Sequence, residues 1–206
     1  MFCVFEGLDG SGKTTLIRNV ATRIQGLEWF KEHFSGLELL KEPTDLEKGL
    51  LIREMLRGGR VPGRLEWLEL FLSDRADNVG VHIAPGLNLG KLLLQDRYYW
   101  STAAYQGRLD ATPTPMEIIA MNEKRGFPAP EILFYLELSP EQSMARARAR
   151  GAVETFETLD QLRKIHRNYE SIVPPTAIRL DAELPTEELV DNVMDSIQSY
   201  RTGAKT

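Results

Sequence analysis

The sequence is poor in several features that would mark other classes of protein. It contains a single cysteine, Cys3, which excludes a framework of internal disulfides. No apolar run approaches the roughly 20 residues that a membrane-spanning helix needs. The net charge of −5 argues against a general nucleic-acid-binding protein. We therefore expect neither a membrane nor a nucleic acid among the partners of this chain.

Targeting signals and low-complexity segments are equally scarce. No basic segment followed by an apolar stretch and a cleavage site precedes Gly7, so we expect a cytoplasmic protein. A length of 206 residues suits one domain with a substantial core. We therefore predict a single domain over residues 1–206, with prolines such as Pro113 and Pro115 marking surface loops inside it.

Apolar runs alternate along the chain with stretches of helical spacing. Residues 2–6, 37–42, 91–96, 131–138 and 177–182 are predicted to be strands, and residues 13–25, 45–57, 64–79 and 186–200 to be helices. Strands separated by helices imply a parallel sheet that is covered on both faces. The expected fold class is α/β, with a doubly wound five-stranded parallel sheet and helices on both faces.

A glycine-rich segment directly follows the first predicted strand. Residues 7–14 read Gly-Leu-Asp-Gly-Ser-Gly-Lys-Thr and match the phosphate-loop pattern G-x-x-x-x-G-K-[ST], with a strand before it and a helix after it. The glycines let backbone N–H groups point at phosphate oxygens, and the following helix adds its positive end. Lys13 is expected to reach the β- and γ-phosphates of ATP, and the Thr14 hydroxyl to bind Mg²⁺. The predicted nucleotide-binding residues are Gly7, Leu8, Asp9, Gly10, Ser11, Gly12, Lys13, Thr14 and Thr15.

A second group of polar residues follows the third predicted strand. In a doubly wound sheet, ligands bind beyond the carboxyl ends of the strands, where this segment falls. An acid, an arginine, two hydroxyls, a phenol and an amide within eleven residues indicate a pocket for a small phosphorylated molecule. A surface turn with a helix cap at Ser101 is the alternative. The residues are Asp96, which is predicted to bind the metal with Thr14, and Arg97, Ser101, Thr102, Tyr105 and Gln106.

Four segments occur in the order and at the spacing found in thymidylate kinases: GLDGSGKTT, KEPTD, FLSDRA and DRYYWSTAAYQG. The sequence resembles that family over essentially its whole length. The resemblance implies transfer of the γ-phosphoryl group of ATP to dTMP, with Mg²⁺ as cofactor. A kinase for another nucleoside monophosphate, such as dUMP or UMP, stays open, because the thymine methyl is worth only about 1–3 kcal/mol of discrimination. A P-loop switch or ATPase without an acceptor is the alternative from a different class.

The resemblance implies roles for residues around the base. Phe71 would stack on the thymine, Arg75 would meet its O4 atom, and Thr102 would bond to N3. Gln106 would line the same pocket. Because Phe71 and Arg75 are four residues apart on one helix, both would use the same side of it. Packing of Phe71 in the core is the alternative.

The resemblance implies further roles around the sugar and the phosphates. Asp9 would hold the sugar 3′-hydroxyl, and Tyr105 would crowd the 2′ position and so favour deoxyribose. Arg97 would bind the acceptor phosphate, with Ser101 in the same pocket. Glu42 would face the metal and the phosphates.

The implied reaction needs no general base, because a phosphate monoester is mostly dianionic at pH 7. It needs cations, because the donor and the acceptor are both polyanions that repel each other. Gly10 stands where one branch of the family carries an arginine in the phosphate loop. The other branch places its arginines in a mobile lid, which we predict at about 144–157. Arg146 and Arg150 share a helix face there, although a solvated helix face would look the same. The predicted catalytic residues are Lys13, Arg97, Arg146 and Arg150.

The predicted helix at 64–79 is apolar over a wide arc. A surface helix needs one apolar stripe only, so this helix is either buried between the core and its neighbours or paired with a second subunit. We expect a homodimer that forms largely through 64–79 and 45–57.

Overall fold

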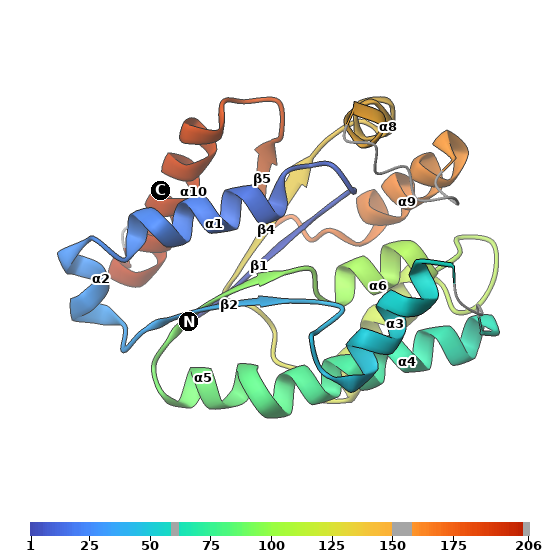
Figure 1. Ribbon diagram of the computed structural model, residues 1–206, viewed down its shortest axis with the longest axis horizontal. Coiled ribbons are helices and arrows are strands. Elements are labelled where there is room, and N and C mark those ends of the chain that lie inside the picture. Colours follow the sequence, from blue (N-terminus) through green and yellow to red (C-terminus); the bar gives the residue numbers. More distant parts are fainter. Residues whose placement is uncertain (59–61, 150–157, 204–206) are drawn as a thin grey trace.

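The computed structural model, which describes residues 1–58, 62–149 and 158–203, has the α/β architecture that the sequence predicts (Figure 1). A parallel five-stranded sheet has the strand order β2-β3-β1-β4-β5. Its strands are β1 (Phe2–Gly7), β2 (Leu37–Lys41), β3 (Leu92–Asp96), β4 (Ile132–Glu137) and β5 (Ile178–Asp181). Because β1 lies between β3 and β4, the glycine-rich loop emerges from the middle of the carboxyl edge of the sheet.

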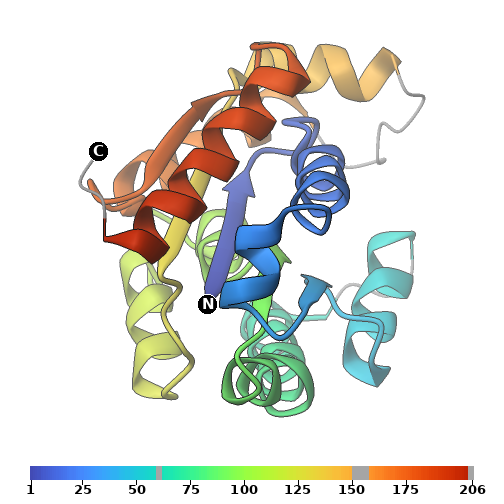
Figure 2. The same ribbon diagram turned by 90° about the vertical axis from the view of Figure 1, so that its left-hand side faces the viewer.

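Successive side chains of β1 enter two separate cores, because side chains of a strand alternate between its faces. Cys3 and Phe5 pack with α1 (Lys13–Ile24) and α10 (Thr186–Thr202). Phe2 and Val4 belong to the core on the other face. Among the helices that contribute to this second core are α4 (Arg64–Asn78), α6 (Tyr99–Gln106), α7 (Pro115–Lys124) and α9 (Leu159–Ile172). The sheet is thus covered on both faces, as Figure 2 shows from the side.

The cysteine is inert in this arrangement. Cys3 is fully buried, and burial raises the pKa of its thiol well above the usual range. Within the described residues, none of the helices combines the length and the apolar character that crossing a membrane requires.

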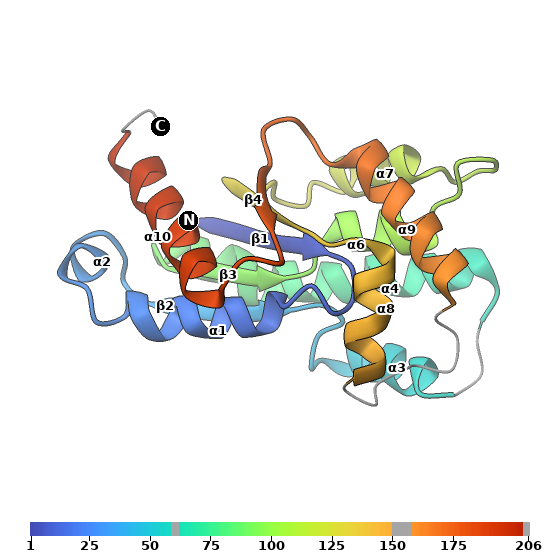
Figure 3. The same ribbon diagram turned by 90° about the horizontal axis from the view of Figure 1, so that it is seen from above.

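The long predicted helix at 64–79 ends as an α-helix at Asn78 and continues through a π-helical turn. The remaining helical elements are α2 (Glu28–His33), α3 (Glu47–Leu56), η1 (Val79–Ile83), α5 (Ala84–Asn88) and α8 (Pro140–Ala149). Helix α8 crosses the carboxyl end of the sheet beside the glycine-rich loop (Figure 3). Its Ser143 hydroxyl donates to the backbone carbonyl of Asp9 over 2.6 Å, which ties the helix to that loop.

One expectation for the prolines was wrong. Pro115 is not in a loop but begins α7, where Thr114 and Glu117 form a reciprocal capping box. The first residues of a helix have no intrahelical partner for their N–H groups, so proline fits that position without loss of a hydrogen bond. The strand boundaries agree with the prediction to within one or two residues.

Candidate active site

The glycine-rich loop needs glycine because its backbone adopts left-handed conformations. Gly10 and Gly12 have φ values of 83° and 92°, and Gly12 caps the start of α1. Gly7 has a φ of 142°, and a Cβ atom there would lie 2.6 Å from the carbonyl oxygen of Leu136. Side chains are therefore disfavoured at these three positions, which leaves backbone N–H groups accessible there.

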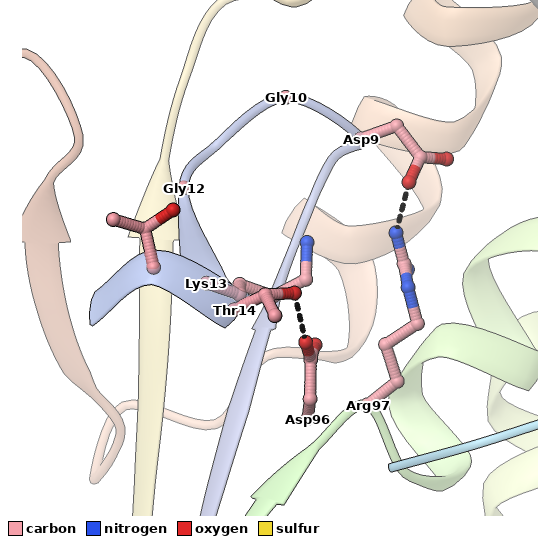
Figure 4. Close-up of a pocket in the computed structure, with 8 residues that line it drawn as sticks. Asp9, Gly10, Gly12, Lys13, Thr14, Asp96 and Arg97 are labelled. Carbon is pink, nitrogen blue, oxygen red and sulfur yellow. Dashed lines mark hydrogen bonds and ion pairs between the residues drawn. The ribbon is translucent and has the colours of Figure 1, made fainter. Parts of the chain in front are cut away.

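The Lys13 side chain is buried, and it bends back so that its ammonium group contacts the phosphate loop. Its Nζ donates to the carbonyl oxygens of Gly7 and Leu8, both at 2.9 Å, and to the Ser11 hydroxyl at 3.2 Å. Burial lowers the pKa of Lys13 to about 8, and the positive charge of Arg97 adds to that effect. The lysine is thus a cation at neutral pH that stands among polar groups of the phosphate loop (Figure 4).

Thr14 and Asp96 meet across a small cavity beside Lys13. The Thr14 hydroxyl donates to Oδ2 of Asp96 over 2.5 Å, while the buried Oδ1 has no hydrogen-bond partner among the described residues (Figure 4). The cavity measures 170 Å³. An orphaned carboxylate oxygen next to a hydroxyl fits a hard cation such as Mg²⁺, which takes oxygen ligands.

The described residues contain no group of three or more histidine, cysteine or acidic side chains that would form a metal cage. Mg²⁺ usually keeps several waters and binds through one or two protein groups together with substrate phosphates. The pair of Thr14 and Asp96 therefore suits Mg²⁺ better than a transition metal.

Arg97 reaches from the end of β3 towards the phosphate loop. Its φ of 67° is left-handed, which turns the chain sharply after Asp96. Its Nη2 donates to Oδ1 of Asp9 over 2.5 Å and its Nη1 to the Ser101 hydroxyl over 2.9 Å. The Tyr105 hydroxyl donates to the other oxygen of Asp9, and its ring centre lies 5.1 Å from the guanidinium carbon. The structure thus brings together four residues that the sequence predicted for one site.

These contacts decide the charge state of Arg97. Burial opposes a positive charge there, but the neighbouring Asp9 carboxylate holds the pKa of Arg97 well above its usual range. The guanidinium is charged at any pH that the protein tolerates, so it is a permanent cation at the mouth of the phosphate loop.

Glu6 supports residues of the candidate site, and sequence reasoning missed it. It is fully buried, and its carboxylate accepts from the backbone N–H groups of Tyr98 and Ser101 at 2.8 and 3.1 Å. The hydroxyls of Ser101 and Tyr169 also donate to it, at 2.5 and 3.0 Å. Burial raises the pKa of Glu6, whereas its hydrogen-bond donors act against that shift. A lone carboxylate in an otherwise apolar strand, directly before Gly7, is the signal that could have found it.

A larger cleft of 1110 Å³ opens beside the phosphate loop, between α4, α6 and α9. Phe71 and Trp67 line it from α4, with ring centres 5.1 Å apart and their planes nearly perpendicular. Phe71 is therefore not a plain core residue, since it lies at the surface of the cleft. Gln106 is half-buried and lines the same cleft.

Arg75 forms the inner wall of this cleft and is 1 % exposed. Its Nη2 donates to Glu42 at 2.5 Å and to the Thr102 hydroxyl at 2.9 Å, and its Nη1 donates to Asn122 at 2.7 Å. The Nε–H has no hydrogen-bond partner among the described residues. Two of the five N–H groups, the Nε–H and the second N–H of Nη1, thus have no partner among the described residues beside a cleft that the same residue lines.

Glu42 was predicted to face the metal and the phosphates. In the described structure it lines the larger cleft, and its carboxylate accepts hydrogen bonds from Arg75 and from the side-chain amide of Asn78, the latter at 3.0 Å. The physical reason is that a fully buried carboxylate needs a cation and donors close by, and α4 supplies both. Burial raises the pKa of Glu42 to about 7, and the neighbouring Arg75 acts against this shift.

The predicted lid is described in its first part only. Arg146 in α8 donates to the carbonyl oxygens of Gly10 at 3.3 Å and Ala182 at 2.9 Å, so its guanidinium lies at the phosphate loop. Arg148 is exposed. Arg150 and the remainder of the predicted lid, 150–157, lie outside the described residues.

Comparison with known proteins gives one consistent result. A family model described as thymidylate kinase matches residues 5–193. The thymidylate kinase of Leptospira interrogans (serovar copenhageni) is 40% identical over 196 residues, which cover 95% of this chain and 92% of the relative. That of Leptospira borgpetersenii is 39% identical with the same coverage. That of Xanthomonas campestris pv. campestris is 34% identical over 192 residues, 92% of this chain and 79% of the relative.

Proposed function

The chain belongs to the thymidylate kinase family, and we propose that it transfers the γ-phosphoryl group of ATP to dTMP, giving dTDP and ADP, in the site described above. The observation that carries the proposal is that Asp9 and Arg97 line both the cavity of the phosphate loop and the larger cleft. A donor in the one and an acceptor in the other would therefore present their phosphates to each other at these two residues.

The phosphate loop and Lys13 bind the donor. The backbone N–H groups of the loop and the Lys13 ammonium surround the β- and γ-phosphates, where negative charge must be offset during transfer. Thr14 and Asp96 would hold Mg²⁺. When bound, this ion would offset part of the negative charge of the phosphates during transfer.

Arg97 binds the acceptor phosphate. In the described structure the two terminal nitrogens of its guanidinium group donate hydrogen bonds to Ser101 and Asp9. A phosphate dianion is a stronger acceptor of the same geometry and would replace one of them. Asp9 is then left to accept a hydrogen bond from the 3′-hydroxyl of the sugar. No general base is needed, because the acceptor is already mostly deprotonated at pH 7.

The cleft beyond Arg97 holds the nucleoside. Phe71 offers a ring face to the base, and the unpaired Nε–H of Arg75 suits an acceptor atom on its edge. Thr102 lies next to Arg75 and is within reach of the same edge. The Tyr105 ring stands near Asp9, where it would crowd a 2′-hydroxyl.

Arg146 supplies further positive charge at the transferring group. The support for this role is its contact with the Gly10 carbonyl, at the position where the phosphate loop carries no cationic side chain. Arg150 is proposed to share this role.

The alternative of a nucleotide-hydrolysing switch is not favoured. The family match covers most of the chain, and the cleft beyond Arg97 has the size and polarity of an acceptor pocket rather than of a site for one water. A panel of nucleoside monophosphates with Mg·ATP, followed by ADP release, tests the proposal. We expect dTMP to be the best acceptor, with dUMP and UMP weaker. ADP release at the same rate without any acceptor would exclude a kinase.

We also propose that the chain forms a homodimer through α3 and α4. These helices pack on each other and expose large apolar side chains to solvent. The residues are Leu50 (54% exposed), Leu51 (41%), Leu56 (38%) and Leu65 (67%). Apolar surface of this kind on two adjacent helices is typical of an interface between subunits.

A further inference from the structure

Asn122 is a fully buried amide on α7, away from the motifs that identify the family. Its Oδ1 accepts from Nη1 of Arg75 over 2.7 Å, although the two residues are 47 positions apart. Its Nδ2 donates to the carbonyl oxygen of Ile118, one turn earlier in α7, over 2.7 Å. The amide is therefore locked in one orientation, with its oxygen towards Arg75, because a flipped amide would place two donors against each other.

Arg75 is held from three other elements as well. Glu42, after β2, and Thr102, in α6, both accept from Nη2. The ring centre of Tyr98 lies 5.0 Å from the guanidinium carbon and covers one face of the group. With Nη1 fixed by Asn122, the guanidinium cannot rotate in its plane, and the Nε–H and the second N–H of Nη1 stay unpaired among the described residues.

An unpaired, buried N–H is costly, and a ligand that supplies an acceptor atom removes that cost. Arg75 carries no acceptor of its own, so a ligand atom that is itself a donor would meet a donor. The arrangement therefore discriminates between a carbonyl oxygen and an amino group at the edge of a base.

We propose that Asn122 is a positioning residue for acceptor selection: it fixes Arg75 so that the site takes a pyrimidine monophosphate with a carbonyl oxygen at C4 and rejects one with an amino group there. This inference rests on the proposed function, since it assumes that the base reaches Arg75. It gives a residue of α7 a part in selecting the acceptor base, and Asn122 acts through Arg75 without contacting either substrate.

The test compares dTMP with dCMP in the full-length chain and in Asn122→Leu, which keeps the volume but removes the acceptor. We expect kcat/KM for dTMP to fall about ten- to a hundredfold, mainly through KM, because a buried charged donor loses its partner. The preference for dTMP over dCMP should narrow, while KM for ATP should stay unchanged. In Asn122→Asp, which keeps an oxygen towards Arg75, the preference should be restored.

Controls separate this role from a structural one. Ile119→Ala removes apolar packing from the same helix and keeps every hydrogen-bond partner of Arg75. It should lower thermal stability and leave the ratio of kcat/KM for dTMP to that for dCMP unchanged. If Asn122→Leu does not fold, Asn122→Ala is measured in its place. An unchanged ratio in a folded Asn122 variant overturns the inference alone. Absence of dTMP-dependent ADP release in the unmodified chain overturns the proposed function and this inference together.

Discussion

Tyr105 donates its phenolic hydrogen to Asp9 over 2.8 Å, so a residue of α6 and a residue of the phosphate loop meet although 96 positions separate them. The contact fixes the ring beside the carboxylate that is proposed to hold the 3′-hydroxyl. The effect of the size of the Tyr105 ring can be separated from the effect of its hydrogen bond, because a phenylalanine at this position keeps the ring and lacks only the hydroxyl.

Tyr105→Ala should admit ribonucleotides better than the parent, because the space beside the 2′ position opens. Tyr105→Phe should keep the parent's preference, since its ring still fills that space. The measurement is the ratio of kcat/KM for dTMP to that for the matching ribonucleotide. If that ratio is the same in Tyr105→Ala as in the parent, the ring does not select the sugar.

Lys13→Ala should lower turnover by about 10²–10³ or more, the cost of removing one preorganised charge-stabilising group. The protein should remain folded, because the lysine bonds to loop carbonyls and not to the apolar core. ADP release and thermal melting measure the two effects. Lys31→Ala, at an exposed position of α2, is the matched control. A folded Lys13→Ala with near-normal turnover would contradict the assignment of the phosphate loop.

The pKa of about 8 for Lys13 predicts a pH dependence. The ammonium form binds phosphate, and it is lost as the pH rises through about 8, so kcat/KM for ATP should fall above that pH. Bound ATP brings negative charge that favours the ammonium, so kcat at saturating ATP should decline only at higher pH. A kcat/KM profile for ATP that stays flat between pH 7 and pH 9 would count against Lys13 as the cation that titrates.

At least one of Arg146→Ala and Arg150→Ala should lower kcat far more than it weakens dTMP binding, because a contact made in the transition state acts on kcat. An arginine in such a position is worth about 10³–10⁵ in rate in related systems. Arg148→Ala is the matched control, as Arg148 is exposed on the same helix. Steady-state kinetics with varied dTMP give both constants. If substitution of Arg146, Arg148 and Arg150 together lowers kcat only a few-fold, these arginines form a solvated helix face and have no catalytic role.

The proposed dimer predicts a sedimentation mass of two chains at micromolar concentration. Leu65→Asp should shift the protein towards the monomer, because it places a charge in apolar surface of α4. Leu89→Asp, at a residue that is 62% exposed elsewhere on the surface, should leave the mass unchanged. A monomeric mass for the parent chain contradicts the proposal.

The sequence predicted the strands and the phosphate loop well because these features depend on local pattern. Gly7, Lys13 and Thr14 occupy fixed places between a strand and a helix, so their spacing alone defines the turn. The start of α7 was missed, although Thr114, Pro115 and Glu117 are a readable helix signal. Two neighbouring prolines were given too much weight as loop markers.

The orientation of side chains could not be predicted in the same way. Glu42 lies in a recognised motif, but its direction depends on Arg75 and Asn78, which reach it from 33 and 36 positions away. Asn122 has no local signal, because its amide acts on a residue of another helix. Contacts between residues so far apart in the sequence depend on how α4, α6 and α7 pack, and the spacing of residues along the chain does not reveal them.

The carboxylate of Glu6 has a consequence for how the protein can open. It lies in β1, one residue before the phosphate loop, and four donors from the α6 region and α9 converge on it. Withdrawing the α6 region would remove three of these donors and withdrawing α9 would remove the fourth, so either loss would leave the buried carboxylate with fewer partners. The strand and these two helices should therefore unfold as one cooperative unit. We therefore expect the two proposed substrate sites, which both lie beside this unit, to be gained and lost together.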